Sequence, residues 1–466
     1  MVNTKWTTCG RKLLLNGKSF FVRGVNYAPT PIGQPGRLDV LGNEGIFTRD
    51  LKNLRGMHAN AVKTYDFYSN VDHSKYLDAA YNGGDRPIYT IFSIWIDQSL
   101  MEPTVDAESP EFQQLVTNYY EMAKLTGAHP GVMGYSIGGE MNSIVVVNDE
   151  AFWDKFAKLT AAVRKGLAQN GNAQKIITTT FVDDGGVSFT KGEQFKADVD
   201  LWGSNVYQTN YAGSVIPAFK GVPGNKPLLV SEYGFPYASN VAEGNAQVLH
   251  KIGSFVVDQA IQMDRNYNLS DALKEQVLVG GFVFEYSDEW WKSGADDIHN
   301  FGGVVNRGFP MGWLAEEFFG LYRPVKAHGK DAIDEVHPRP TVDLLTKLWA
   351  GQKLAGEGDD YSSCRVLSTT TSLQQLRHGP AVSQPSSVFG SFVEGMFAIV
   401  ALCALALMAF AVHDSKSRRA RYRRLSQSNG LTDQTSGVSS YRTPMSPTSS
   451  RRFRAALVDY EDEQEV

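Results

Sequence analysis

The sequence contains few of the features that mark metal-dependent, nucleotide-dependent or nucleic-acid-binding proteins. Its nine histidines form no pair with the H-x-x-x-H type of spacing that binds zinc. No glycine-rich loop follows an apolar run in the manner of a phosphate-binding site. The net charge of −5 over 466 residues gives no basic excess suited to nucleic acid. We therefore expect no metal, no cofactor and no nucleic-acid partner.

The first residues, MVNTKWTTCGRKLLL, lack the apolar core of a signal peptide, whereas the far end carries a long apolar segment. Residues 395–412 are uncharged and mostly apolar, and six Lys or Arg residues follow between Lys416 and Arg424. We predict one transmembrane helix over 388–412, with residues 1–387 outside the plasma membrane and the tail in the cytoplasm. A buried core helix is the alternative, and the adjacent basic cluster argues against it. Because an exported domain needs a signal peptide, we expect the natural chain to begin differently.

Eight short apolar or β-branched runs lie between residues 20 and 290. Near-continuous hydrophobicity is typical of strands buried on both faces, as in parallel sheets. Helical patterns lie between them, for example at 111–127 and 150–171. Eight alternating strand–helix units predict an α/β protein of the (β/α)8 TIM-barrel type, for which about 250 residues is usual. The eight runs are 20–27, 60–66, 87–94, 132–140, 174–182, 199–207, 227–234 and 279–287.

The chain is therefore predicted to contain four segments. The barrel occupies 10–350 and a polar stalk 351–387. The transmembrane helix at 388–412 follows, and then a disordered tail at 413–466 that is rich in Ser, Thr and Arg.

Only three cysteines are present, and Cys403 lies within the apolar segment. Cys9 and Cys364 lie at the two ends of the globular region, and the ends of a closed barrel meet. A disulfide between them outside the cell and two free thiols are both consistent with the sequence. The acceptor sequence Asn268-Leu-Ser270 predicts a glycoprotein.

Two glutamates end apolar strands at glycine-flanked corners. The fourth predicted strand ends in Glu140, within GYSIGGEMN, and the seventh in Glu232, within LLVSEYG. Catalytic groups of a TIM barrel sit at the carboxyl ends of its strands, so both side chains should face the same mouth. Two carboxylates converging on one cleft suit glycoside hydrolysis, one as acid/base and the other as nucleophile or base.

Rings and polar groups stand at the other strand ends. Sugars are bound by aromatic faces and dense hydrogen bonding, so this lining predicts a carbohydrate site, with Trp290 and Trp291 as the foremost stacking candidates. The candidates for substrate binding are Tyr27, Tyr65, Asp66, Trp95, Asn205, Tyr207, Tyr286, Trp290 and Trp291.

Five motifs in order, FFVRGVNYAP, NAVKTYDFYSNVDHSKYLD, GYSIGGEMN, LLVSEYGFP and GGFVFEYSDE, resemble those of the retaining β-glycosidase clan of TIM barrels. The similarity covers residues 12–325 and is closest to the fungal cell-wall β-1,3-glucanosyltransferases. It implies that Glu140 is the acid/base and Glu232 the nucleophile, and that Tyr207 bonds the nucleophile.

The chain departs from that clan at two positions. Gly139 stands where relatives carry an Asn that grips the sugar 2-OH, and Asn142 is a candidate to replace that amide. Lys63 stands where relatives carry Arg, and an ammonium cannot bind a carboxylate in the bidentate manner of a guanidinium.

The sequence thus predicts a retaining glycoside hydrolase or transglycosylase that remodels a β-linked glucan by double displacement. The alternative is a membrane-anchored glycan receptor whose barrel has lost its chemistry. Gly139 and Lys63 are the residues that favour the receptor.

Overall fold

The computed structural model describes residues 4–143, 145–171, 173–237, 245–268, 276–292, 295–299, 316–329, 333–354 and 356–362. All of them belong to one compact unit, Met1–Val366. The predicted transmembrane segment 388–412 and tail 413–466 lie outside the described residues. Over the part of the chain that the structure describes, no helix has both the length and the apolar character needed to cross a bilayer.

A ring of parallel strands forms the centre of this unit. The strand order is β8-β7-β6-β5-β4-β12-β11-β10-β9, and every neighbouring pair is parallel. The two ends of this order, β8 (Ile176–Thr179) and β9 (Phe181–Val182), are consecutive pieces of one run broken only at Thr180. The ring is therefore closed by eight strand positions, and the predicted TIM barrel is confirmed. The other strands are β4 (Val22–Asn26), β5 (Ala61–Lys63), β6 (Tyr89–Ser93), β7 (Val132–Ile137), β10 (Trp202–Asn205), β11 (Leu228–Tyr233) and β12 (Leu278–Val283).

The apolar runs form these strands because both of their faces are covered. Every residue of β7, β11 and β12 is buried, toward the barrel interior on one face and toward the helices on the other. All eight predicted runs overlap a barrel strand that is shorter than the run by a few residues, and β12 begins one residue before its run.

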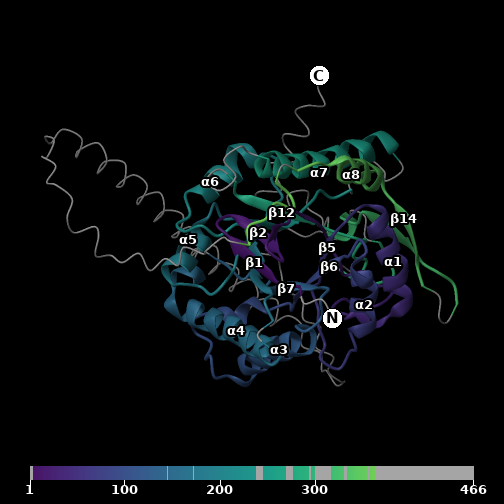
Figure 1. Cartoon of the computed structure of the whole chain (residues 1–466). Coiled ribbons are helices and arrows are strands. Elements are labelled where there is room, and N and C mark those ends of the chain that lie inside the picture. Colours follow the sequence, from purple (N-terminus) through teal and green to yellow (C-terminus); the bar gives the residue numbers. More distant parts are fainter. Residues whose placement is uncertain are drawn as a thin grey trace, which may run out of the picture. The chain divides into compact units, whose positions relative to one another are not determined.

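Helices surround the strands in Figure 1, and their starts follow the sequence signals. Asn43, Ser109 and Asp149 accept hydrogen bonds from the first turns of α1, α3 and α4. The predicted helices at 111–127 and 150–171 are α3 and α4. The helices are α1 (Glu44–Gly56), α2 (Ser74–Tyr81), α3 (Pro110–Thr126), α4 (Glu150–Ala168), α5 (Val187–Gln194), α6 (Ile216–Lys220), α7 (Ala246–Tyr267) and α8 (Pro340–Gly351).

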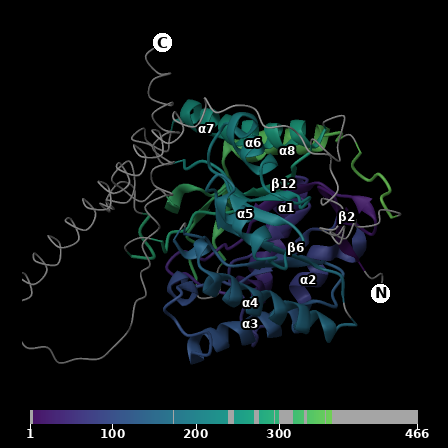
Figure 2. The same ribbon diagram turned by 90° about the vertical axis from the view of Figure 1, so that its left-hand side faces the viewer.

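A small antiparallel sheet covers the amino-terminal end of the barrel and was not predicted. It consists of β1 (Trp6–Cys9), β2 (Lys12–Leu15) and β3 (Lys18–Ser19), and Figure 2 shows β2 beside one end of the barrel. Residues 356–362 return to this sheet, where Asp360 pairs with Lys18. These residues therefore belong to the folded unit rather than to the predicted stalk.

Cys9 is disulfide-bonded, so the alternative of a free thiol at this position is excluded. The second cysteine lies outside the described residues, and its identity as Cys364 stays a prediction.

A hairpin of β13 (Tyr322–Val325) and β14 (Glu335–Pro338) leads into α8. It was not predicted either. It packs near the mouth of the barrel, where the carboxyl end of β12 is bridged to Tyr322 through Ser287.

Candidate active site at the barrel mouth

Glu232 lies at the carboxyl end of β11 and is held by three donors. The phenols of Tyr65 and Tyr207 donate to its two oxygens, at 2.7 Å to Oε1 and 2.8 Å to Oε2. The Lys63 ammonium lies 3.3 Å from Oε1. The residue is only 6% exposed, so these donors replace the water that would otherwise stabilise the charged carboxylate.

Lys63, at the end of β5, is the counter-charge inside the site. Its ammonium is buried and lies 4.0 Å from the centre of the Tyr65 ring. Burial lowers the pKa of Lys63, and the negative charges of Glu232 and Glu140 act in the opposite direction. Both carboxylates therefore lie close enough to interact with one ammonium group.

Tyr65 remains a phenol rather than a phenolate. Burial raises the pKa of Tyr65 well above its ordinary value, and the charge of Glu232 raises it further. Its hydroxyl is therefore a permanent donor to Glu232. The Phe284 ring contacts both phenol rings in a T-shaped geometry, with its centroid 6.2 Å from that of Tyr65 and 6.2 Å from that of Tyr207.

Glu140 occupies a tight corner after β7. The φ of Glu140 is +53°, and that of Gly138, two residues before it, is +83°. The Glu140 N–H donates to the Thr180 carbonyl at 2.7 Å. The carboxylate accepts a hydrogen bond from the Asn205 amide at 2.9 Å. Unlike Glu232, Glu140 is partly exposed.

Asn205 connects the two glutamates. It ends β10 and pairs in register with Glu232 of β11. Its amide oxygen accepts from the Ser231 hydroxyl at 2.8 Å, which fixes the orientation of the group that donates to Glu140. The structure thus brings Glu140, Asn205 and Glu232 together, as the strand positions predicted.

The structure places the side chains of three predicted sugar-binding residues in contact with helices and loops of the fold. Tyr27 and Tyr286 are fully buried, and both donate hydrogen bonds to Asp50 of α1 instead of facing the mouth. Asn142 cannot supply the missing amide, because it donates to Ser188 at 2.9 Å and accepts from the Val182 N–H at 2.8 Å. The side chains of these three residues therefore contact helices and loops of the fold.

The remaining predicted residues lie on the loops that follow β5, β6 and β12. Trp95, Trp290 and Trp291 are all partly exposed, and Trp290 stacks on His299 with 4.7 Å between ring centres. Asp66 follows Tyr65; burial raises its pKa to about 6, against the opposing charge of Arg37.

Sequence reasoning missed Arg37 and Glu285. Arg37 lies in the long loop after β4, and no strand end or motif singles it out. Glu285 is part of the motif GGFVFEYSDE, but the sequence offers no reason to include it among the candidate site residues. It is 1% exposed, and burial raises its pKa well above the ordinary value, with further increases from Glu289, Asp288 and Glu232.

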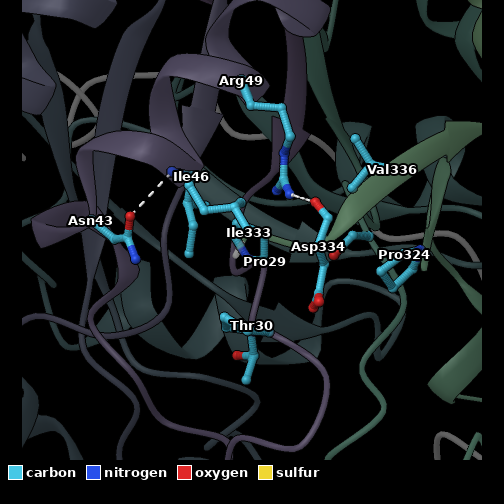
Figure 3. Close-up of a pocket in the computed structure, with 11 residues that line it drawn as sticks. Pro29, Thr30, Asn43, Ile46, Arg49, Pro324, Ile333, Asp334 and Val336 are labelled. Carbon is cyan, nitrogen blue, oxygen red and sulfur yellow. Dashed lines mark hydrogen bonds between the residues drawn. The ribbon is translucent and has the colours of Figure 1, made fainter. Parts of the chain in front are cut away.

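A small pocket lies on the side of the mouth, between α1 and the β13–β14 hairpin (Figure 3). Its volume of about 50 Å³ is far below the several hundred Å³ of typical ligand sites. Arg49 points across it and donates to the Asp334 carbonyl. Neither Glu140 nor Glu232 lines it, so this pocket is not the candidate active site.

Comparisons with known proteins point to one family. The sequence profile of the glucanosyltransferase family matches residues 6–184. The 1,3-beta-glucanosyltransferase gas5 of Schizosaccharomyces pombe is 22% identical over 287 residues, which cover 58% of this chain and 51% of that protein. The corresponding GAS5 protein of Saccharomyces cerevisiae is 22% identical over 280 residues, covering 59% of this chain and 54% of its own. The chain therefore spans about half the length of the curated relatives it matches.

Solved structures agree on the fold. Gas2p of Saccharomyces cerevisiae, a mutant in complex with laminaritetraose and laminaripentaose, superposes with a TM-score of 0.53 at 16% identity. The match covers 75% of this chain and 68% of that one. A second Gas2 structure, in complex with a small compound, gives a TM-score of 0.55 with 78% and 73% covered. The chain is thus similar to the β-1,3-glucanosyltransferases in sequence over somewhat more than half of its length, and to Gas2 in the fold of the barrel.

Proposed function

We propose that this barrel is a retaining enzyme that cleaves and rejoins β-1,3-glucan. The substrate class follows from the relatives, which are named as 1,3-beta-glucanosyltransferases. The observation that carries the chemistry is the pair of unequal carboxylates. Glu232 is buried and held by three donors, whereas Glu140 is partly exposed and accepts from the Asn205 amide.

Glu232 is the nucleophile in this proposal. Hydrogen bonds from Tyr65 and Tyr207, together with the Lys63 ammonium, fix the direction of its two oxygens. It attacks the anomeric carbon, and the bond from that carbon to the leaving sugar oxygen breaks. Lys63 and the two phenols then stabilise the charge that returns to the carboxylate when the intermediate breaks down.

Glu140 is the acid/base. In the first step it gives its proton to the leaving oxygen, and in the second it takes a proton from the incoming acceptor. The acceptor is water in hydrolysis and a sugar hydroxyl in transglycosylation. The Asn205 amide donates to Glu140 and so holds its carboxyl toward the cleft throughout.

The proposed place of action is the outer face of the plasma membrane, where the barrel meets the cell wall. It rests on the apolar segment at 388–412 and the basic cluster after it.

The direct test is to incubate the protein with laminari-oligosaccharides of one length and to separate the products by size. We expect both shorter and longer oligosaccharides from the unaltered protein. Glu232→Gln should retain the fold and lose turnover on the order of 10³-fold or more, because the nucleophile is gone. The matched control is Glu121→Gln, which changes a glutamate paired with Lys124 on α3 and should not affect the rate.

A receptor remains the second candidate because of Gly139, which carries no side chain beside the acid/base. Oligosaccharide binding without any product would favour it. Unchanged turnover in Glu232→Gln would instead contradict the double-displacement mechanism.

A further inference from the structure

Arg37 covers two of the three tryptophans that the sequence marks as candidates for sugar binding, Trp95 and Trp291. Its guanidinium carbon lies 4.0 Å from the centre of the Trp95 ring and 5.9 Å from that of Trp291. Trp95 follows β6 and Trp291 follows β12, so one side chain reaches rings from two separate loops. Contacts of a cation with an indole face at these distances are attractive.

The loop that carries Arg37 is fixed rather than loose. The Tyr68 hydroxyl donates to the Arg37 carbonyl, and the Tyr68 N–H donates to Asp39 at 2.8 Å. Asp39 also bonds His73 at 2.8 Å. Trp291 packs directly on Gly36, where an added Cβ would lie 2.1 Å from the ring.

Arg37 is also held by charge. Asp66 is largely buried beside it, and the positive charge of Arg37 opposes the burial that raises the pKa of this carboxyl to about 6. The attraction between the guanidinium and the Asp66 carboxyl therefore stabilises the position of Arg37 over the rings when no sugar is bound.

Trp95 connects this arrangement to the reacting groups. A Cβ built on Gly139, the residue before Glu140, would lie 3.8 Å from Trp95 Cδ1. The acid/base corner, Trp95, Arg37 and Trp291 therefore follow one another along one wall of the mouth. An indole face covered by a guanidinium is not open to the stacking of a sugar ring.

We propose that Arg37 is a specificity-determining residue that limits the number of sugar units bound along this wall. The inference rests on the proposed function, because it takes β-1,3-glucan as the ligand. A glucan chain extends from Glu140 toward Trp95 and ends at the guanidinium that covers this ring, so that longer chains gain no further contact there.

Arg37→Gly is the most suitable test variant. The φ of Arg37 is +65°, which glycine adopts without strain, so the loop should fold at least as well. Arg37→Lys, which keeps a cation over the ring, is the matched control. Both are made in the full chain carrying Glu232→Gln, so that the ligand is not consumed.

Affinities for laminari-oligosaccharides of increasing length are then measured by titration calorimetry. In the protein that retains Arg37 and in Arg37→Lys the affinity should level off with length, whereas in Arg37→Gly it should continue to rise. The longest oligosaccharide should bind about tenfold more tightly to Arg37→Gly, the gain expected from one aromatic contact, and short ones equally. Quenching of tryptophan fluorescence by acrylamide should also increase in Arg37→Gly without ligand.

An identical length profile in all three proteins would overturn the inference, as would weaker binding of every length by Arg37→Gly. Unchanged quenching would show that Arg37 does not cover the rings. If none of the proteins binds any laminari-oligosaccharide, the proposed function itself fails and this inference with it.

Discussion

At the scale of single residues, the two carboxylates differ in the groups that surround them. Glu232 meets an ammonium and two phenols in a nearly closed environment, which suits a nucleophile whose oxygens must be held in one direction. Glu140 meets the Asn205 amide at a partly exposed corner, which suits a group that gains and loses a proton in each cycle. Different surroundings allow two carboxyl groups in one site to take different roles, one as the acid and the other as the nucleophile.

Gly139 is the position at which a substitution is expected to raise the catalytic efficiency, because it lacks the amide that relatives carry beside the acid/base. An added Cβ there would meet only Trp95 Cδ1, at 3.8 Å, so Gly139→Asn should fold normally. We expect kcat/KM on laminari-oligosaccharides to rise roughly tenfold or more, since a hydrogen bond to the sugar 2-OH strengthens in the transition state.

The control for this variant is Gly139→Ala, which fills the same space without an amide. A rise with Asn but not with Ala is the expected pattern. Equal rates in all three proteins would show that an amide at this position does not contact the sugar.

The sequence located Glu140, Glu232, Asn205 and Tyr207 because strand ends are positions that a hydrophobic pattern reveals. It misplaced Tyr27 and Tyr286 because one residue decides which way a side chain points at the end of a strand. Asn26 is buried inside the barrel and bonds the Ser231 carbonyl, while its neighbour Tyr27 bonds a helix outside. No feature of the sequence reveals which of these two neighbouring side chains points into the barrel and which points toward the helices.

At the scale of elements, α1 is attached to the barrel through a buried acid. Asp50 accepts hydrogen bonds from Tyr27, which follows β4, from Tyr286, which follows β12, and from Arg49. Burial raises the pKa of Asp50, and these donors act in the opposite direction. One carboxylate thus joins the helix to two neighbouring barrel strands.

Asp50→Asn should lower the free energy of unfolding by about 3 kcal/mol, because it removes the negative partner of a buried ion pair and leaves the Arg49 charge uncompensated. Urea unfolding followed by circular dichroism measures the change. Asn43→Ala, which removes only the helix cap of α1, should cost about 1 kcal/mol and serves as the comparison. A smaller effect for Asp50→Asn than for Asn43→Ala would contradict this account of the helix.

At the scale of the whole folded unit, the sequence predicted the barrel but not its base. The barrel strands are recognisable because both faces are buried. The strands β1 to β3 are two to four residues long and mix polar with apolar side chains, so they carry no such periodicity. The contact of residues 356–362 with β3 is long-range and equally invisible in the local sequence.

The base also contains a buried lysine, Lys175, whose pKa links the stability of the fold to pH. Burial lowers the pKa of Lys175 to about 7, although its ammonium donates to the Val132 carbonyl at 2.8 Å and to Thr4 at 3.0 Å. Between this value and the ordinary lysine pKa the folded state binds fewer protons than the unfolded state. The free energy of unfolding should therefore rise with pH across that window.

Lys175→Met should reduce this rise, measured as the difference between urea unfolding at about pH 7 and about pH 9.5. Lys165→Met, which changes an exposed lysine of α4, should leave the rise unchanged. Equal pH dependence in Lys175→Met and the unaltered protein would contradict the assignment.

The covalent intermediate on Glu232 tests the central claim most directly. The protein is treated with a 2-fluoro laminaribiosyl donor, which slows breakdown of the glycosyl–enzyme, and its peptides are analysed by mass spectrometry. The account predicts that one glycosyl group is attached to the peptide containing Glu232, and that Glu232→Gln takes up no label. Label on another carboxylate would contradict it, as would glucan cleavage without any covalent intermediate.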